Sequence, residues 1–170
     1  LRKMQGAFGL PQGKKVTART GINTGEMLVG NIGSHNRFTY AAMGDAANLG
    51  SRLEGANKFY GSFIMVGERT AELSGKSIYF RELDSILVVG RDNPVNVFEP
   101  LGNFDNTDSK QIFLKENYEK ALLLYREGNF SQANEIFKKL KESDPVSNTL
   151  SERCLKYLTS PPDFWPNNWN

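Results

Sequence analysis

The sequence predicts an α+β fold, an α/β sandwich, followed by a C-terminal α-helical tail. Between residues 16 and 100, short runs of β-branched and aromatic residues alternate with amphipathic helical segments, a pattern typical of layered domains. A polar stretch at residues 102–108 then marks a shift in composition, and from Ile112 the apolar residues recur at helical spacing. We therefore divide the chain into a domain at 1–102, a linker at 103–109, a helical tail at 110–160 and a proline- and aromatic-rich terminus at 161–170.

The first part of the chain is expected to be mainly β-structure, because turn residues separate short runs with high strand propensity. The expected elements are, in order, the end of a helix at 1–10, a turn at 11–13, strands at 16–23 and 26–31 that pair as a hairpin, a turn at 33–36 and a strand at 37–43.

A helix is expected from Asp45 to about Phe59. Asp45 suits the N-cap or the first turn, where the helix dipole stabilises a carboxylate, and Gly61 suits the C-terminal end. Apolar residues at helical spacing indicate that one face packs on a sheet, and they are Ala46, Leu49, Leu53 and Ala56. The elements expected next are a strand at 62–66, a helix at 68–73 and strands at 78–83, 85–89 and 95–100.

The tail is expected to contain a pair of helices and a third helix that closes them. Asp108 and Ser109 can cap the first helix, and breaks occur at 128–129 and 144–145. The segment GNFSQANEIFKKLKESDP (residues 128–145) resembles one tetratricopeptide unit, and a generic helical hairpin is the alternative. Because one such unit cannot bury its own face, residues 147–158 are expected to pack as a closing helix.

Composition narrows the classes of function. The net charge of +2 and the lack of a basic run with interleaved aromatic residues argue against a nucleic-acid partner. No apolar run approaches the ~20 residues that a membrane helix needs. The single cysteine, Cys154, cannot form an internal disulfide, which fits a reducing compartment. The chain begins at Leu1 without an initiator methionine, so we expect it to be part of a longer protein.

The strongest candidate site lies in residues 40–54, which read YAAMGDAANLGSRLE. On the expected helix, Asn48 and Arg52 are four residues apart and therefore share a face. An amide and a guanidinium on one rigid face can bind a sugar oxygen and a phosphate together, since the planar guanidinium stays charged and fits two phosphate oxygens. A solvated helix face is the alternative for any pair with this spacing alone.

The flanking segments favour the catalytic interpretation. They are RTGINTGEMLVGNIGS (19–34), EGANKFYG (54–61), FRELDSILVVGR (80–91) and VNVFEPL (95–101). In this order they resemble the second half of the catalytic domain of class III nucleotide cyclases, which make cyclic AMP or cyclic GMP from the nucleoside triphosphate. The resemblance covers about residues 16–102 and implies a partial, ferredoxin-like cyclase fold. The tail resembles the segment C-terminal to the cyclase domain in bacterial membrane-sensor cyclases, which implies the cytoplasmic portion of a membrane-anchored parent protein.

The resemblance implies roles for individual residues. Arg52 would contact the phosphate, Asn48 would position the ribose, and Ala41, Gly44 and Asp45 would bind the nucleotide. Two Mg²⁺ or Mn²⁺ ions would be held by aspartates of the missing N-terminal half, so that this chain has no metal ligand.

An alternative for the metals is that Asp45 and Glu54 act as substitute ligands, which the family's arrangement disfavours. In the family, two protomers pair head to tail, one supplying the metals and the other the asparagine and arginine. A homodimer is therefore expected, and the fragment alone is expected to be inactive.

We thus expect part of an adenylate cyclase that converts ATP to cyclic AMP and pyrophosphate in signal transduction. Ala41 departs from the family, because many adenylate-type members carry a polar residue there and alanine offers no side-chain hydrogen bond to a purine. GTP as substrate therefore stays open, as does a catalytically silent module for dimerisation or regulation. A third interpretation makes the tail a docking surface for a protein partner, which an exposed apolar groove on residues 112–158 would support.

Overall fold

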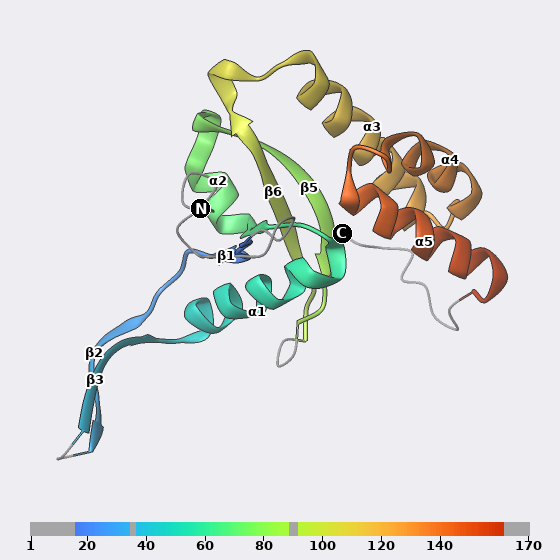
Figure 1. Cartoon of the computed structure of the whole chain (residues 1–170). Coiled ribbons are helices and arrows are strands. Elements are labelled where there is room, and N and C mark those ends of the chain that lie inside the picture. The colour runs from blue at the N-terminus through green and yellow to red at the C-terminus, as the bar shows by residue number, and fades with distance from the viewer. Residues whose placement is uncertain (1–15, 35–36, 89–91, 162–170) are drawn as a thin grey trace.

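The chain folds into a mixed sheet, a separate two-stranded arm and a group of C-terminal helices (Figure 1). The computed structural model describes residues 16–34, 37–88 and 92–161, so the helix end expected at 1–10 and the turn at 11–13 lie outside the described residues. The elements are β1 (Thr20–Ile22), β2 (Leu28–Ser34), β3 (Arg37–Met43), α1 (Asp45–Tyr60), β4 (Ile64–Gly67), α2 (Glu68–Ser74), η2 (Gly75–Ser77), β5 (Ile78–Ile86), β6 (Val95–Asn103), η3 (Phe104–Asn106), α3 (Ser109–Arg126), α4 (Phe130–Leu140) and α5 (Pro145–Thr159).

The sheet has the strand order β1-β4-β6-β5, with β1 parallel to β4 and the other neighbours antiparallel. Within the described residues, β2 and β3 pair only with each other, and they form an arm that reaches away from the sheet and the helices (Figure 1). The helices α3, α4 and α5 gather beside β5. None of the helices in the described ranges is long and apolar enough to cross a membrane.

The hairpin expected between residues 16–23 and 26–31 is wrong. β1 instead pairs in parallel with β4, while β2 pairs with β3. Parallel neighbours need a crossover connection, and α1 provides it here. The side-chain amide of Asn23 donates a hydrogen bond to the carbonyl of Ala46 (3.0 Å), so the chain that leaves β1 is attached to α1 and does not turn back.

The two strands expected at 78–83 and 85–89 form one strand, β5. The register against β6 shifts between Glu82 and Asp84, and this irregularity lets a single strand continue. The polar pair Asp84 and Ser85 has the composition of a turn, but both residues are buried in the structure. The Asp84 carboxylate accepts a hydrogen bond from the Ser85 amide (2.8 Å), which satisfies part of its need for partners inside the protein.

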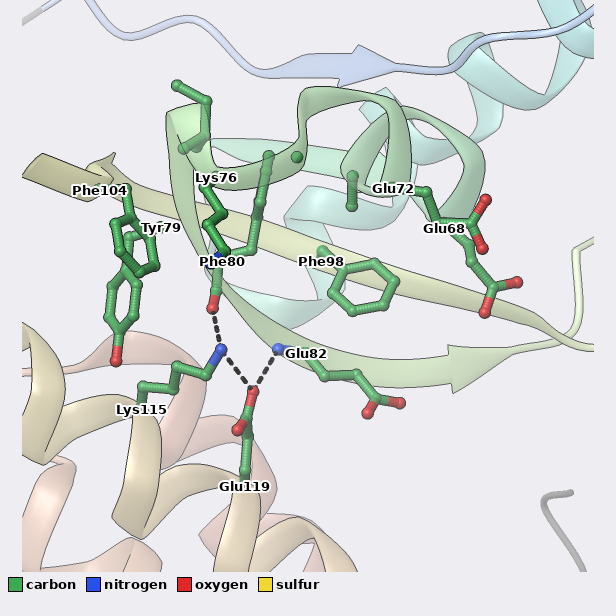
Figure 2. Close-up of a pocket in the computed structure, with 13 residues that line it drawn as sticks. Glu68, Glu72, Lys76, Tyr79, Phe80, Glu82, Phe98, Phe104, Lys115 and Glu119 are labelled. Atoms are coloured by element: carbon green, nitrogen blue, oxygen red, sulfur yellow. Dashed lines mark hydrogen bonds and ion pairs between the residues drawn. The ribbon is translucent and has the colours of Figure 1, made fainter.

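Helix α3 covers the outer edge of β5 with its side chains. The Lys115 ammonium donates to the carbonyl of Phe80 (2.7 Å), and the Glu119 carboxylate accepts from the amide of Glu82 (3.1 Å) (Figure 2). Unpaired backbone groups on an edge strand invite pairing with another chain. Because α3 satisfies these groups, it takes the place that a further strand would have beside β5.

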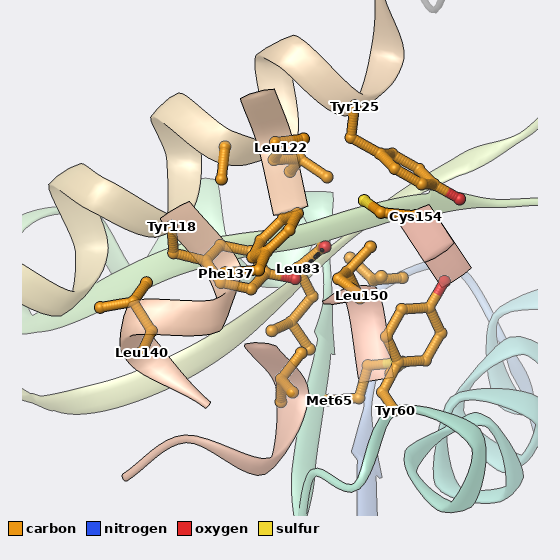
Figure 3. Packing of buried hydrophobic residues seen from close by; sticks show 14 of the residues in the cluster. Tyr60, Met65, Leu83, Tyr118, Leu122, Tyr125, Phe137, Leu140, Leu150 and Cys154 are labelled. Atoms are coloured by element: carbon orange, nitrogen blue, oxygen red, sulfur yellow. Dashed lines mark hydrogen bonds between the residues drawn. The ribbon is translucent and has the colours of Figure 1, made fainter. Parts of the chain in front are cut away.

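One hydrophobic core joins the sheet to the tail (Figure 3). Met65 of β4 and Leu83 of β5 are fully buried, as are Tyr118, Phe137 and Leu150 from the three tail helices. The Tyr118 hydroxyl donates to the carbonyl of Leu83 (2.7 Å), and its ring meets that of Phe137 edge to face at 5.4 Å. The domain and the tail that composition distinguishes therefore share one core in the structure.

The tail helices begin close to the positions that the sequence predicts. The Asp108 carboxylate accepts from the Gln111 amide and the Gln111 side chain accepts from the Asp108 amide, which is a complete capping box. Asp144 caps α5 by accepting from the amide of Ser147 (2.9 Å). The closing helix expected at 147–158 is present as α5. The relation to a tetratricopeptide unit stays a prediction.

Candidate active site

Helix α1 begins and ends at glycines whose backbone conformations suit no other residue well. Gly44, the residue before the helix, has φ 144°, and Asp45 comes after it as the acidic residue of the first turn. Gly61 ends the helix in the left-handed conformation with φ 72°, and its amide donates to the carbonyl of Asn57. The expected helix is therefore confirmed, and these two glycines set its length.

The inner face of α1 is fixed to the sheet by apolar packing and by one buried amide. Leu49 and Leu53 are buried, and Asn57 is 0% exposed. The Asn57 side chain donates to the carbonyl of Thr20 in β1 (3.0 Å) and accepts from the Ser62 hydroxyl (2.8 Å). Asn57 is not among the residues predicted from the sequence, although it continues the four-residue spacing of Leu49 and Leu53, and that spacing could have found it.

The predicted catalytic pair flanks the buried face of α1, since Asn48 and Arg52 each come directly before a buried leucine. Asn48 is exposed and Arg52 is half-buried, one helical turn further on. Within residues 16–34, 37–88 and 92–161, no hydrogen bond or ion pair engages the side-chain amide of Asn48 or the Arg52 guanidinium. Both groups are thus available to oxygen atoms of a ligand.

Arg52 lies on a groove of about 420 Å³ between α1, the end of β5 and α5. Apolar side chains form most of its wall, namely Ala56, Phe59, Ile86, Leu87 and Val88. A second guanidinium, that of Arg153 in α5, also lines it. Cationic groups beside apolar walls suit an organic anion.

The other predicted site residues are placed elsewhere. Asp45 is exposed and lines a different cavity, of about 300 Å³, that also involves Glu68 of α2. Ala41 lies on the arm, in β3, directly opposite Gly30 of β2. Gly44 joins the arm to α1, so it links the element that carries Ala41 to the element that carries the catalytic pair.

Among the described residues, no three acidic, histidine or cysteine side chains come together as a metal site. Asp45 and Glu54, the alternative ligands, are both exposed and belong to no such group. That the metal ligands belong to another part of the protein stays a prediction.

A buried polar cluster adjoins the groove and was not foreseen from the sequence. The Tyr60 hydroxyl donates to the Asp84 carboxylate (2.5 Å), and an Arg153 nitrogen lies 3.3 Å from the same oxygen. Burial raises the pKa of Asp84, and hydrogen bonds from Tyr60 and from the Ser85 amide oppose that rise. Burial also raises the pKa of Tyr60, so its hydroxyl stays protonated and serves as a hydrogen-bond donor to Asp84. A carboxylate within a buried strand requires such partners.

The tail also has a cavity, of about 440 Å³, between α3 and α4. Phe113, Leu114 and Leu140 give it an apolar wall, and Lys110 and Lys139 lie at its border. Nothing in the described structure shows what covers it, so a partner protein for the tail stays a prediction.

Comparisons with known proteins agree on one family. Residues 1–99 match the family of the adenylate and guanylate cyclase catalytic domain. The terminal-differentiation-specific adenylate cyclase of Dictyostelium discoideum is 32% identical over 151 residues, which is 84% of this chain and 7% of that protein. A match of this extent has to include part of the tail.

Two further similarities are confined to a smaller part of the chain. Adenylate cyclase 1 of Rhizobium meliloti is 37% identical over 98 residues, 58% of this chain and 14% of that protein. The structure of the adenylyl cyclase CyaB from P. aeruginosa superposes with a TM-score of 0.51 at 32% identity, covering 63% of this chain and 53% of that chain. The chain thus spans only a small part of the curated relatives named here.

Proposed function

Since the chain belongs to the family of adenylate and guanylate cyclase catalytic domains, we propose that it is the C-terminal part of an adenylate cyclase. The reaction is the conversion of ATP to cyclic AMP and pyrophosphate. The relatives from Dictyostelium discoideum and Rhizobium meliloti, both adenylate cyclases by name, favour ATP as the substrate.

The observation that carries this proposal is the unengaged pair Asn48 and Arg52 on a helix that is packed on the sheet and hydrogen-bonded to it. In the reaction, the ribose 3′-hydroxyl loses its proton to solvent, its oxygen forms a bond to the α-phosphorus, the bond to the bridging oxygen breaks, and pyrophosphate leaves. Negative charge grows on the phosphate oxygens meanwhile, so the protein contributes mainly positioning and electrostatic stabilisation. Arg52 stabilises that charge, and Asn48 holds the ribose.

The direct test is Arg52→Ala in the full-length protein that contains this chain. We expect kcat to fall by ~10²–10³, the scale of losing one preorganised contact to a developing oxyanion. Lys58→Ala is the matched control, because Lys58 is an exposed cation near the end of the same helix. Near-normal activity of Arg52→Ala would overturn the assignment, and a full-length protein without cyclase activity would favour a silent module for dimerisation.

The arm supports a homodimer as the working form. Large apolar side chains on both of its faces are exposed, among them Leu28 (80%), Tyr40 (74%) and Phe38 (61%). An isolated two-stranded ribbon is only marginally stable, and exposed apolar clusters mark surfaces that a partner covers. In the proposed dimer a second protomer covers the arm and brings its metal-binding half to Asn48 and Arg52.

Complementation tests the shared site. A full-length protein with Arg52→Ala keeps its metal-binding half, and this chain brings an intact Asn48 and Arg52. Cyclase activity of the mixture should rise with added chain and then saturate, while a chain that itself carries Arg52→Ala should rescue nothing. Sedimentation must first show a folded chain bound to the full-length protein. Binding without any rescue would contradict the shared site.

A further inference from the structure

Tyr60, the last residue of α1, is where the tail contacts the helix that carries the catalytic pair. Tyr60 is 5% exposed, and its ring lies near Leu150 of α5 (Figure 3). Its hydroxyl donates to Asp84 of β5 (2.5 Å) and accepts from a guanidinium nitrogen of Arg153 in α5 (3.1 Å). The same guanidinium stacks over the Tyr60 ring, 4.4 Å from its centroid. Three elements, α1, β5 and α5, therefore meet at one side chain.

The tail also touches the backbone at this end of α1. The Thr149 hydroxyl lies 3.3 Å from the carbonyl oxygen of Tyr60 and 3.2 Å from that of Pro145, so it shares its hydrogen bond between the two helices. The Tyr60 carbonyl is one of the last four of α1, which have no partner within the helix. Gly61 packs so closely on α5 that an added Cβ would lie 3.2 Å from the Cβ of Pro145. The C-terminal end of α1 thus packs against the first two turns of α5.

The contact between Tyr60 and α5 affects the position of Arg52, because a displacement at one end of a helix is transmitted along its axis. Arg52 lies eight residues before Tyr60, about 12 Å along a helix that rises 1.5 Å per residue. Asn57 ties the same helix to β1, so rotation of α1 is resisted at Asn57 and at Tyr60. Arg52 and Arg153 line one groove, which shows that the contact and the candidate catalytic group lie at the same end of the molecule.

We propose that Arg153 is a positioning residue, which acts through Tyr60 to set the orientation of α1 and so places Arg52 against the phosphate. This inference rests on the proposed function. It makes the tail a component of the catalytic unit, because α5 supplies the guanidinium that holds the catalytic helix. The inference gives the two guanidinium groups that line the groove different roles, because Arg52 contacts the substrate and Arg153 holds the end of α1 through Tyr60.

The test compares Arg153→Ala and Arg153→Lys with Lys156→Ala in the full-length protein. Lys156 is an exposed cation on the same helix, one turn from Arg153, and serves as the matched control. Arg153→Ala should lower kcat roughly tenfold, because a small misplacement of a catalytic group is costly, and should leave KM almost unchanged. Arg153→Lys should recover part of the loss, and Lys156→Ala should change neither constant. If Arg153→Ala proves too unstable to assay, Tyr60→Phe removes the bridging hydroxyl alone and should lower kcat in the same direction.

A double-mutant cycle separates positioning from general destabilisation. If Arg153 acts by placing Arg52, then Arg153→Ala should cause no further loss of kcat in the Arg52→Ala background. Equal losses in both backgrounds would overturn the proposal, and so would a raised KM with normal kcat, which would make Arg153 a direct substrate ligand.

Hydrogen exchange gives a readout without turnover, since the amides of residues 57–62 should exchange faster in Arg153→Ala than in Lys156→Ala. Unchanged exchange would also overturn the proposal.

Comparing Arg52→Ala with Arg153→Ala distinguishes a failure of the positioning role from a failure of the proposed function on which it rests. Loss of kcat in Arg52→Ala together with normal kcat in Arg153→Ala would contradict only the positioning role. A full-length protein without cyclase activity, or with normal activity in Arg52→Ala, would contradict the proposed function and the positioning role together.

Discussion

Position 41 is where a single side chain bears on the choice of base. Ala41 cannot donate or accept a side-chain hydrogen bond, and it faces Gly30 across the arm, where a Cβ on the glycine would itself meet nothing within 4 Å. We expect Ala41→Thr or Ala41→Asp to fit there and to change the ratio of kcat/KM for ATP to that for GTP. One restored hydrogen bond is worth ~0.5–1.5 kcal/mol, so the ratio should change several-fold in at least one variant. An unchanged ratio in both would show that position 41 does not read the base.

The residues that sequence reasoning found differ in kind from those it missed. Asn48 and Arg52 were found because they share a helix face and because the segments on both sides of them resemble a known family. Asp84 and Arg153 were missed because their importance comes from partners far away in the chain. No local pattern records that Arg153 meets a tyrosine at the end of α1.

Substitution of two glycines by alanine should have opposite effects on stability. Gly21 of β1 faces helix α1, and Gly50 lies within it. A Cβ on Gly21 of β1 would overlap the carbonyl oxygen of Gly50 and the amide nitrogen of Glu54, so Gly21→Ala should destabilise the chain by about 2 kcal/mol or more. A Cβ on Gly50 itself would come no closer than 3.9 Å to any neighbour, so Gly50→Ala should stabilise it by ~0.5–1 kcal/mol through helix propensity. Urea unfolding measures both, and equal effects would refute the close β1–α1 contact.

Helix α3 gives the element-scale prediction about the edge of the sheet. Glu119→Ala leaves the amide of Glu82 without its acceptor, which should cost ~1 kcal/mol of unfolding free energy and expose part of the β5 edge. The variant should therefore also self-associate more strongly as its concentration rises, as sedimentation velocity would show. Glu116→Ala is the control, an exposed glutamate three residues earlier on the same helix. If the two variants behave alike, α3 does not protect the edge.

At the scale of the whole molecule, the positions of helices and strands were easier to predict than the way in which these elements pair and pack. The strand at 37–43, α1 and the tail helices can be deduced from turn residues, caps and local periodicity, and the structure has them close to the expected bounds. The pairing of β1 with β4 and the bulge in β5 depend on contacts between distant segments, which periodicity does not encode. The shared core of sheet and tail could not be predicted for the same reason, because it forms only where α3 and α5 pack against β5.

A buried ionic cluster connects the sheet to the tail and predicts how stability depends on pH. Arg81 of β5 is 1% exposed, and its guanidinium binds both oxygens of the Asp144 carboxylate (2.7 and 2.8 Å) and also Glu99 of β6. Burial alone would raise the pKa of Asp144, but the hydrogen bonds and charge of Arg81 and the hydrogen bonds of Ser147 outweigh it and lower that pKa below 3.8. The folded chain therefore holds this proton more weakly than the unfolded chain does.

The sign of the pH effect is set by that lowered pKa. The stabilisation from ionised Asp144 is complete above the unfolded pKa of about 4 and is lost as pH falls through the lower folded pKa. Breaking a buried ion pair costs about 3 kcal/mol or more, so Asp144→Asn should reduce the unfolding free energy by about that amount at pH 7. Below about pH 4 the difference from the unsubstituted chain should shrink, because its own carboxylate is then becoming neutral. Asp105→Asn, at an exposed aspartate of η3, should show almost no difference at any pH. Denaturant unfolding from pH 3 to pH 7 measures this, and a constant difference for Asp144→Asn would show that the Arg81 contact does not depend on the charge of Asp144.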